Sequence, residues 1–168
     1  SMLHSLKLYK VLSYILIVLA FLFAFMDAIF LMSALANPSA LIFVFALACF
    51  VIYAFASFRF FRHGVEREQI LPKKSKDWIK VNAYVSLFLC SLFFLNSASL
   101  LMSSNAVLIK LSEEFLAQQA GLPAGINTQL VLQVIKGASV FLLITGIVGL
   151  LHIRTTLRLV KQYDYLFE

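Results

Sequence analysis

Four long runs of apolar residues follow one another along the chain and are separated by polar segments. The first run, residues 11–36, is about 26 residues long and carries a single acidic side chain, Asp27. A helix of about 20 apolar residues crosses the roughly 30 Å hydrocarbon core of a bilayer, so each run predicts a transmembrane helix. The predicted spans are residues 9–36, 40–61, 79–103 and 130–153.

The polar segments predict how these helices are connected. The Asn-Pro-Ser sequence at residues 37–39 favours a tight turn between the first two spans. Residues 64–78 form a basic linker, and residues 104–129 carry apolar and charged side chains at helical spacing. We therefore expect an all-α integral membrane protein with a single domain over residues 2–168. Its predicted fold is a four-transmembrane-helix bundle with an extra amphipathic helix in the outer 3–4 loop.

The first span has one face of small residues that also holds its acidic side chain. Steps of three and four residues place seven side chains on one stripe, most of them small: Ser13, Ile17, Ala20, Ala24, Asp27, Leu31 and Ala34. Small residues let two helix backbones approach closely, so this stripe is the predicted packing face. The phenylalanines of the span lie mostly off the stripe, and we expect them mainly to face lipid. They are Phe21, Phe23, Phe25 and Phe30.

The composition supports a membrane protein and changes the interpretation of the net charge. Of the 168 residues, 62% are hydrophobic and only 13% are charged, which excludes an ordinary soluble domain. The formal charge of +6 is therefore expected to mark cytoplasmic loops and not nucleic-acid binding. Ser1 before Met2 resembles a residue left by tag cleavage. The first apolar run is too long for the core of a signal peptide, so we expect it to be retained.

Lysine and arginine are distributed unevenly between the two predicted sides of the membrane. Twelve of them lie in the N-terminal segment, around the 64–78 linker and in the C-terminal tail. Only two, Lys110 and Lys136, lie between the third and fourth spans. Because cytoplasmic loops are enriched in these residues, both termini and the linker are predicted to be cytoplasmic. We expect residues 104–129 to be extracytoplasmic and the membrane to be a bacterial inner membrane.

Four polar side chains at similar predicted depth form a candidate intramembrane site. Asp27 lies about 7 Å outward of the centre of its helix, and Asn96 falls at about the same depth in the antiparallel third span. Ser99 and Ser139 are close to this level. The cluster is either a titrating site on a solute path or a set of interhelical hydrogen bonds, each worth on the order of 1 kcal/mol. The structural interpretation is preferred, because no intramembrane basic residue accompanies the aspartate.

The basic residues near the predicted cytoplasmic face are candidate contacts for anionic lipid headgroups. Each contributes about 1 kcal/mol of attraction close to the surface, although topology alone accounts for most of these charges. His63 and His152 lie near the same face without nearby acids or cysteines, so no metal or haem site is predicted. The candidate contacts are Arg59, Arg62, Lys73, Lys74, Lys76, Arg154 and Arg158.

The chain lacks the motifs that would indicate a catalytic or cofactor site. It has no Gly-rich phosphate loop, no HExxH sequence and no Ser-centred hydrolase motif. Cys49 and Cys90 lie at similar depth in the second and third spans, where cysteine is most often a small packing residue. We therefore predict no catalytic residue, no metal, no cofactor and no enzymatic activity.

The amphipathic stretch 105–120 is the other candidate site. It could be an interfacial helix, a lid over the Asp27 region or a surface for a partner protein. The leading expectation is a non-enzymatic accessory or scaffold subunit that acts through helix packing and this outer segment. Its expected partners are the bilayer, a second copy of the chain or another membrane protein. The alternative is an oligomeric channel or a proton-coupled small-solute transporter whose path is lined by Asp27 and Asn96.

Overall fold

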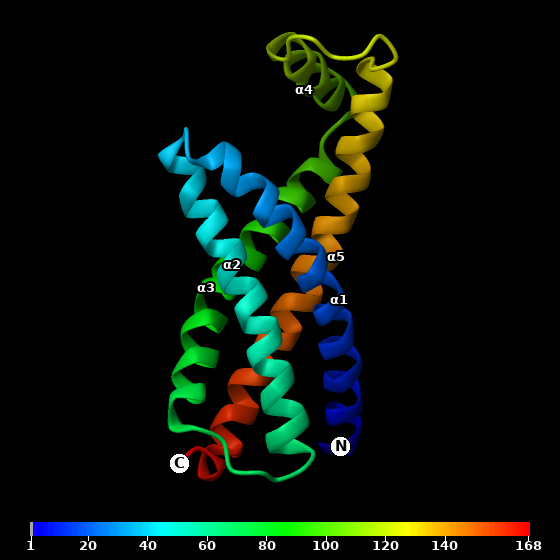
Figure 1. The fold of residues 1–168 in the computed structure, drawn as a ribbon. Coiled ribbons are helices and arrows are strands. Elements are labelled where there is room, and N and C mark those ends of the chain that lie inside the picture. Colours follow the sequence, from blue (N-terminus) through cyan, green and yellow to red (C-terminus); the bar gives the residue numbers. More distant parts are fainter. Residues whose placement is uncertain (1) are drawn as a thin grey trace. The chain divides into compact units, whose positions relative to one another are not determined.

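Residues 2–168, which the computed structural model describes, fold into five α-helices and contain no β-strand. Four of the helices are long and apolar enough to cross a membrane. A π-helical turn, Phe60–Val65, follows the second helix, and a short 3₁₀ helix, Asp164–Leu166, lies near the C-terminus. The α-helices are α1 Met2–Ala34, α2 Pro38–Arg59, α3 Lys73–Met102, α4 Asn105–Gln118 and α5 Thr128–Gln162 (Figure 1).

The four predicted spans correspond to α1, α2, α3 and α5, and the predicted amphipathic helix corresponds to α4. The long helices α1, α3 and α5 extend beyond the apolar runs. Lysine, arginine and glutamine are good helix formers, so the helices continue into polar sequence. The predicted 64–78 linker is shorter in the structure, because α3 already begins at Lys73. The predicted end of the second span, Phe61, falls inside the π-helical turn.

The connection between α1 and α2 is the predicted tight turn. The side chain of Asn37 caps α2, since its Oδ1 accepts hydrogen bonds from the Ser39 backbone N–H over 3.2 Å and from the Ser39 hydroxyl over 2.7 Å. Pro38 occupies the first helical position, where a missing N–H costs nothing. α1 and α2 therefore form an antiparallel hairpin.

The structure divides into two compact units. Unit 1 contains the chain up to Cys90 and residues Val148–Glu168, which are α1, α2, the first part of α3 and the last part of α5. Unit 2 is Ser91–Ile147, which contains the rest of α3, all of α4 and the first part of α5.

The packing face of α1 in unit 1 agrees largely with the predicted stripe of small residues. Ser13, Ala20 and Ala34 are each at most 2% exposed, whereas Leu31 of the same predicted stripe is 44% exposed. The expectation that the phenylalanines of α1 face away from the packing surface is wrong for Phe23, which is also only 2% exposed. Phe23 follows Ala20 by three residues, so it lies on the same side of the helix. Phe25 points away from that side and stays 67% exposed.

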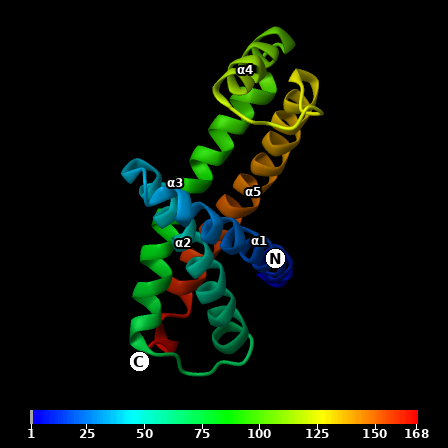
Figure 2. The ribbon, with the colours of Figure 1, turned by 45° about the horizontal axis from the view of Figure 1, so that its top comes forward.

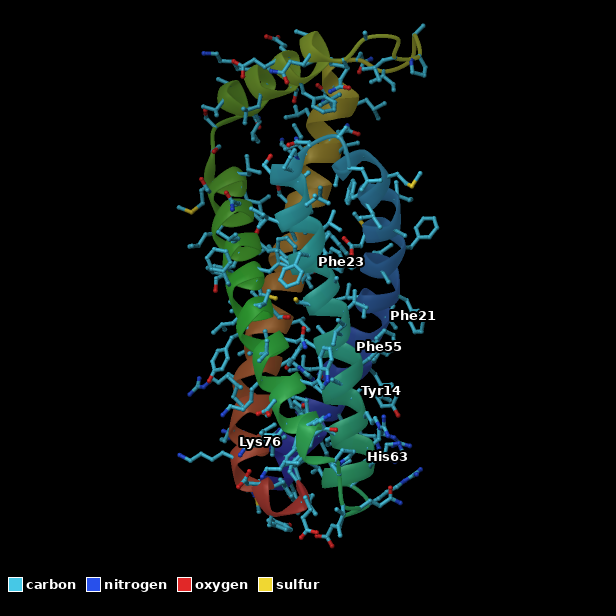
Figure 3. The ribbon with its side chains drawn as sticks, turned by 60° about the vertical axis from the view of Figure 1, so that its left-hand side comes forward. Tyr14, Phe21, Phe23, Phe55, His63 and Lys76 are labelled. Atoms are coloured by element: carbon cyan, nitrogen blue, oxygen red, sulfur yellow. The ribbon has the colours of Figure 1, made fainter. Side chains whose placement is uncertain are left out.

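Aromatic side chains join α1 and α2 along the hairpin (Figure 3). They meet edge to face, the arrangement that aligns the positive edge of one ring with the negative face of the other. The ring centroids are 5.2 Å apart for Tyr14 and Phe58, 5.3 Å for Phe21 and Phe55, and 5.6 Å for Phe23 and Phe50.

The linker after α2 and the C-terminal tail pack together at one end of unit 1. The backbone N–H of Leu71 donates to the carbonyl of Leu166 over 2.8 Å, and the N–H of Glu168 donates back to the carbonyl of Leu71 over 3.0 Å. Lys76 adds an ion pair with Asp164 at 2.5 Å. The tail therefore returns to the linker after α5 ends.

The beginning of α1 lies at the same end of unit 1. Lys10 Nζ is 3.2 Å from a carboxylate oxygen of Glu66, just beyond the π-helical turn. The side chains of His63 and Lys76 also project from this end (Figure 3). Both termini and the α2–α3 linker thus lie at one end of unit 1 (Figure 1).

Unit 2 contains the predicted amphipathic helix. The hydroxyl of Ser104 caps α4 by accepting from the Val107 backbone N–H, and Asn127 Oδ1 accepts from the Leu130 N–H over 2.9 Å at the start of α5. Lys136 of α5 donates to Asn105 of α4 over 3.1 Å. α4 and the loop after it therefore lie at the end of unit 2 where α5 begins (Figure 2).

Candidate functional site

Five polar side chains are buried together between α1, α2 and α5 in unit 1. They are contributed by all three helices, and each is at most 2% exposed. Burying a polar group costs free energy unless the group forms hydrogen bonds. The members of such a cluster therefore have to form hydrogen bonds with one another. We call this cluster the His152 network; it consists of Tyr9, Ser13, Tyr53, His152 and Thr156.

Both ring nitrogens of His152 have a hydrogen-bond partner. Nε2 lies 2.8 Å from Ser13 Oγ, and Nδ1 lies 2.6 Å from the Tyr53 hydroxyl. The ring of Tyr9 stacks on the imidazole with centroids 4.5 Å apart, and Tyr53 meets the imidazole edge to face at 5.5 Å. Hydrogen bonds and aromatic contacts from two other helices therefore fix the orientation of the imidazole.

The hydroxyl of Thr156 closes the network. Its Oγ1 lies 2.7 Å from the Tyr9 hydroxyl and 2.7 Å from the Tyr53 hydroxyl. A threonine hydroxyl has one donor and two acceptor lone pairs, so it can serve both tyrosines at once. Among the described residues, every buried polar side-chain atom of the network has a partner.

Matching four-residue spacings on two antiparallel helices place these groups opposite one another. Tyr9 and Ser13 lie four residues apart on α1, and His152 and Thr156 lie four residues apart on α5, so each pair occupies one helix face. The antiparallel packing sets Tyr9 against Thr156 and Ser13 against His152. Tyr53 of α2 then reaches both α5 side chains.

The geometry of the network suits helix association better than chemistry on a substrate. The imidazole of His152 is 0% exposed and has both of its nitrogens engaged, so it has no free position for a substrate or a metal ion. In the low-dielectric interior of a helix bundle, hydrogen bonds are electrostatically stronger than in water. The network therefore holds α1, α2 and α5 in one arrangement.

The sequence interpretation grouped His152 with His63 and so missed this network. The two histidines differ in environment: His63 is half-buried near the linker, with Nδ1 3.2 Å from Gln69 Oε1. The signal that could have found the network is the pair of four-residue polar spacings in two helices that the topology predicts to be antiparallel.

The structure places the members of the predicted intramembrane site in both units. Asp27 belongs to unit 1, where one of its carboxylate oxygens is buried without a hydrogen-bond partner among the described residues. The other three belong to unit 2. There, Asn96 donates to the Leu92 carbonyl over 2.8 Å and Ser139 to the Ile135 carbonyl over 2.7 Å, each within its own helix. Ser99 is exposed on α3.

Two of the seven predicted lipid contacts form ion pairs within the protein. Arg62 pairs with Glu66 at 2.7 Å and Lys76 pairs with Asp164. The ion pairs described for residues 2–168 involve none of the other five candidates. These are Arg59 on α2, Lys73 and Lys74 at the start of α3, and Arg154 and Arg158 on α5.

The two cysteines are buried free thiols. Cys90 packs against Gly149 of α5, where an added Cβ would clash with Cys90 Sγ. Within residues 2–168, no three His, Cys, Asp or Glu side chains lie close enough together to hold a metal ion. The contact with Gly149 gives Cys90 a packing role.

Comparison of the sequence with protein-family models, with curated proteins and with solved structures found no match.

Proposed function

We propose that the chain is an integral membrane protein that spans the bilayer with α1, α2, α3 and α5. Each of these helices is longer than the roughly 20 residues that a span needs, and their apolar side chains are widely exposed. The end of unit 1 that holds both termini and the linker carries most of the lysines and arginines. By the positive-inside rule, this end faces the cytoplasm.

Within the membrane, the protein acts as a non-enzymatic accessory or scaffold subunit. The observation that carries this proposal is the closed His152 network. The polar groups of the His152 network form hydrogen bonds with one another, so the network offers no free base or nucleophile. A site for catalysis needs such a group within reach of a substrate. The network instead holds α1, α2 and α5 in a rigid arrangement, and other proteins bind to the surface of this rigid protein.

The surface proposed for association is the exposed apolar part of α4, which includes Leu111 and Phe115. Two of its apolar side chains are exposed: Leu111 by 38% and Phe115 by 49%. Exposed apolar side chains on an amphipathic helix are typical of surfaces that bind a partner or the bilayer interface. The proposed partner is a membrane protein or a second copy of this chain.

Association through α4 can be measured by native mass spectrometry of the protein extracted in native nanodiscs. We expect a particle that contains more than one polypeptide chain, and the double variant Leu111→Glu/Phe115→Glu should reduce it to a single chain. Charges on an apolar surface must be desolvated when that surface is buried, so the association should weaken at least tenfold.

The matched control for this experiment is Ala117→Glu/Gln118→Glu, which adds the same charge to exposed positions at the end of the same helix. This variant should stay assembled. A wild-type protein that is a stable solitary chain in every extract would contradict the scaffold proposal.

Asp27 favours a second candidate function, a channel or transporter path. A buried carboxylate oxygen without a partner is costly, and such groups in membrane helices often belong to ion or proton pathways. If Asp27 lines a path, proteoliposomes should show ion or solute flux that Asp27→Asn abolishes.

Asp27→Leu tests whether the aspartate is a structural contact. Because the carboxylate oxygen has no hydrogen bond to lose, we expect leucine to leave the free energy of unfolding unchanged or to raise it by about 1 kcal/mol. A loss of more than 1 kcal/mol would show that Asp27 bonds to another group in the membrane. Stability of both variants is measured by detergent unfolding, alongside flux.

A further inference from the structure

A basic hollow lies between the beginning of α1 and the end of α5 in unit 1. Its volume is about 230 Å³, and the polar residues that line it are Ser5, Tyr9, Arg154, Thr155 and Arg158. We call it the α1–α5 hollow. None of the residues that line it is acidic.

The two arginines hold uncompensated charge. They lie four residues apart on α5 and so share one helix face, where like charges repel each other. The ion pairs described for residues 2–168 engage Lys10, Arg62 and Lys76 but neither of these arginines. An anion placed between the two guanidinium groups would relieve this repulsion.

One hydrogen bond joins two of the residues that line the hollow. Arg158 Nη2 donates to Ser5 Oγ over 3.0 Å, which links the two helices and fixes one guanidinium group at the edge of the hollow. An arginine has five N–H donors arranged as a planar fork, so Arg158 keeps donors for a phosphate oxygen. Fork-shaped donors match phosphate groups well, because two parallel hydrogen bonds can form.

The other side of the hollow is apolar. Leu8 is 56% and Leu151 is 49% exposed, and Leu12 lies beneath them. Leu12 and Leu151 are nearer to the centres of their apolar runs than Ser5 and the arginines are, whereas Leu8 precedes the first run and lies at the level of the arginines. A ligand that fills this hollow would therefore have an anionic part at the helix ends and an apolar part toward the middle of the spans.

We propose that the α1–α5 hollow binds an anionic phospholipid. The phosphate is held by Arg154 and Arg158, and the first carbons of an acyl chain lie on Leu12 and Leu151. This inference rests on the proposed membrane placement, which puts the arginines at the level of the cytoplasmic headgroups. Of the seven predicted lipid contacts, the proposal selects Arg154 and Arg158, because both line a hollow that has no acidic residue in its lining.

Lipid occupancy should also stabilise unit 1. Tyr9 lines the hollow and donates or accepts a hydrogen bond in the His152 network. A ligand that binds the folded state and not the unfolded state raises stability by mass action. A bound lipid therefore secures the helix pair on which the network depends.

The proposal is tested by native mass spectrometry of the purified protein titrated with palmitoyl-oleoyl-phosphatidylglycerol or with the phosphatidylcholine of the same chains. Two basic residues at the surface, each contributing attraction to an anionic lipid, should favour phosphatidylglycerol at least tenfold. Arg154→Gln/Arg158→Gln should abolish the preference. The matched control, Lys73→Gln/Lys74→Gln, removes the same charge from the start of α3 and should change it less than threefold. An equal loss in both variants, or no preference in the wild type, would overturn the site.

A second measurement keeps the test valid if the arginine variant misfolds. Phosphatidylglycerol with a photoreactive headgroup is cross-linked to the wild-type protein in nanodiscs, and the modified peptides are sequenced. Adducts should concentrate at the beginning of α1 and on the stretch 151–158 of α5. Adducts spread over the linker and α3 instead would contradict the proposal.

The outcomes for the lipid site and for the scaffold function are separable, because the hollow lies in unit 1 and α4 lies in unit 2. Leu111→Glu/Phe115→Glu should lose association and keep the lipid preference. Arg154→Gln/Arg158→Gln should do the reverse. Failure of the protein to insert into nanodiscs would overturn the membrane placement, and the lipid site with it.

Discussion

Replacing His152 with alanine should lower the free energy of unfolding by about 3–5 kcal/mol. The change removes a fully buried ring, which typically costs about 2–5 kcal/mol for a large-to-small substitution, and it removes the hydrogen bonds that the Ser13 and Tyr53 hydroxyls form with the imidazole. The stacked contact with Tyr9 is lost as well. Unfolding in mixed micelles, titrated with sodium dodecyl sulfate, measures the difference.

Two comparisons isolate the contribution of the network. His63→Ala removes the same side chain from a half-buried position with one long hydrogen bond, and it should cost less than about 1 kcal/mol. A double-mutant cycle between His152→Ala and Tyr53→Phe should give a coupling energy of about 0.5–3 kcal/mol. A His152→Ala protein as stable as the wild type, or a coupling energy of zero, would rule out a stabilising network.

Gly149→Ala should destabilise the protein by about 1–3 kcal/mol, although alanine normally favours a helix. The added Cβ would clash with Cys90 Sγ and come within 3.4 Å of Cys90 Cβ, so α3 and α5 could no longer approach as closely. The same unfolding titration reports the change.

The chain contains a matched glycine and a rescuing substitution. Gly137 lies on the same helix and has open space around the position of a Cβ, so Gly137→Ala should raise stability by up to about 1 kcal/mol. Cys90→Ala removes the sulfur that obstructs the new methyl group, and the double variant Gly149→Ala/Cys90→Ala should recover more than half of the loss. If the two glycine variants behaved alike, close packing at Gly149 would be refuted.

The helices of this protein were largely predictable from its sequence. Each apolar run is long enough to satisfy its backbone hydrogen bonds within one helix, so α1, α2, α3 and α5 follow from local composition. The turn before α2 was equally predictable, because Asn37 and Pro38 act on their immediate neighbours. The amphipathic spacing of α4 and its cap at Ser104 are also local signals.

The candidate site was not predictable in the same way. A histidine that follows an apolar run and precedes Arg154 has the same local sequence whether it faces the headgroups or the bundle interior. Only the rotation of α5 against α1 and α2 decides between these, and that rotation depends on contacts between residues more than 90 positions apart.

Local sequence by itself determined the all-helical fold, the four long apolar helices and the basic character of the segments near the termini and the linker. The tertiary structure decided which polar residues became partners, that Phe23 packs inward, and that Arg154 and Arg158 share a hollow with Ser5. The physical reason is that helix formation satisfies backbone groups within a few residues. A buried side chain must instead find its partner on another helix, and the register of that helix is a property of the whole packing arrangement.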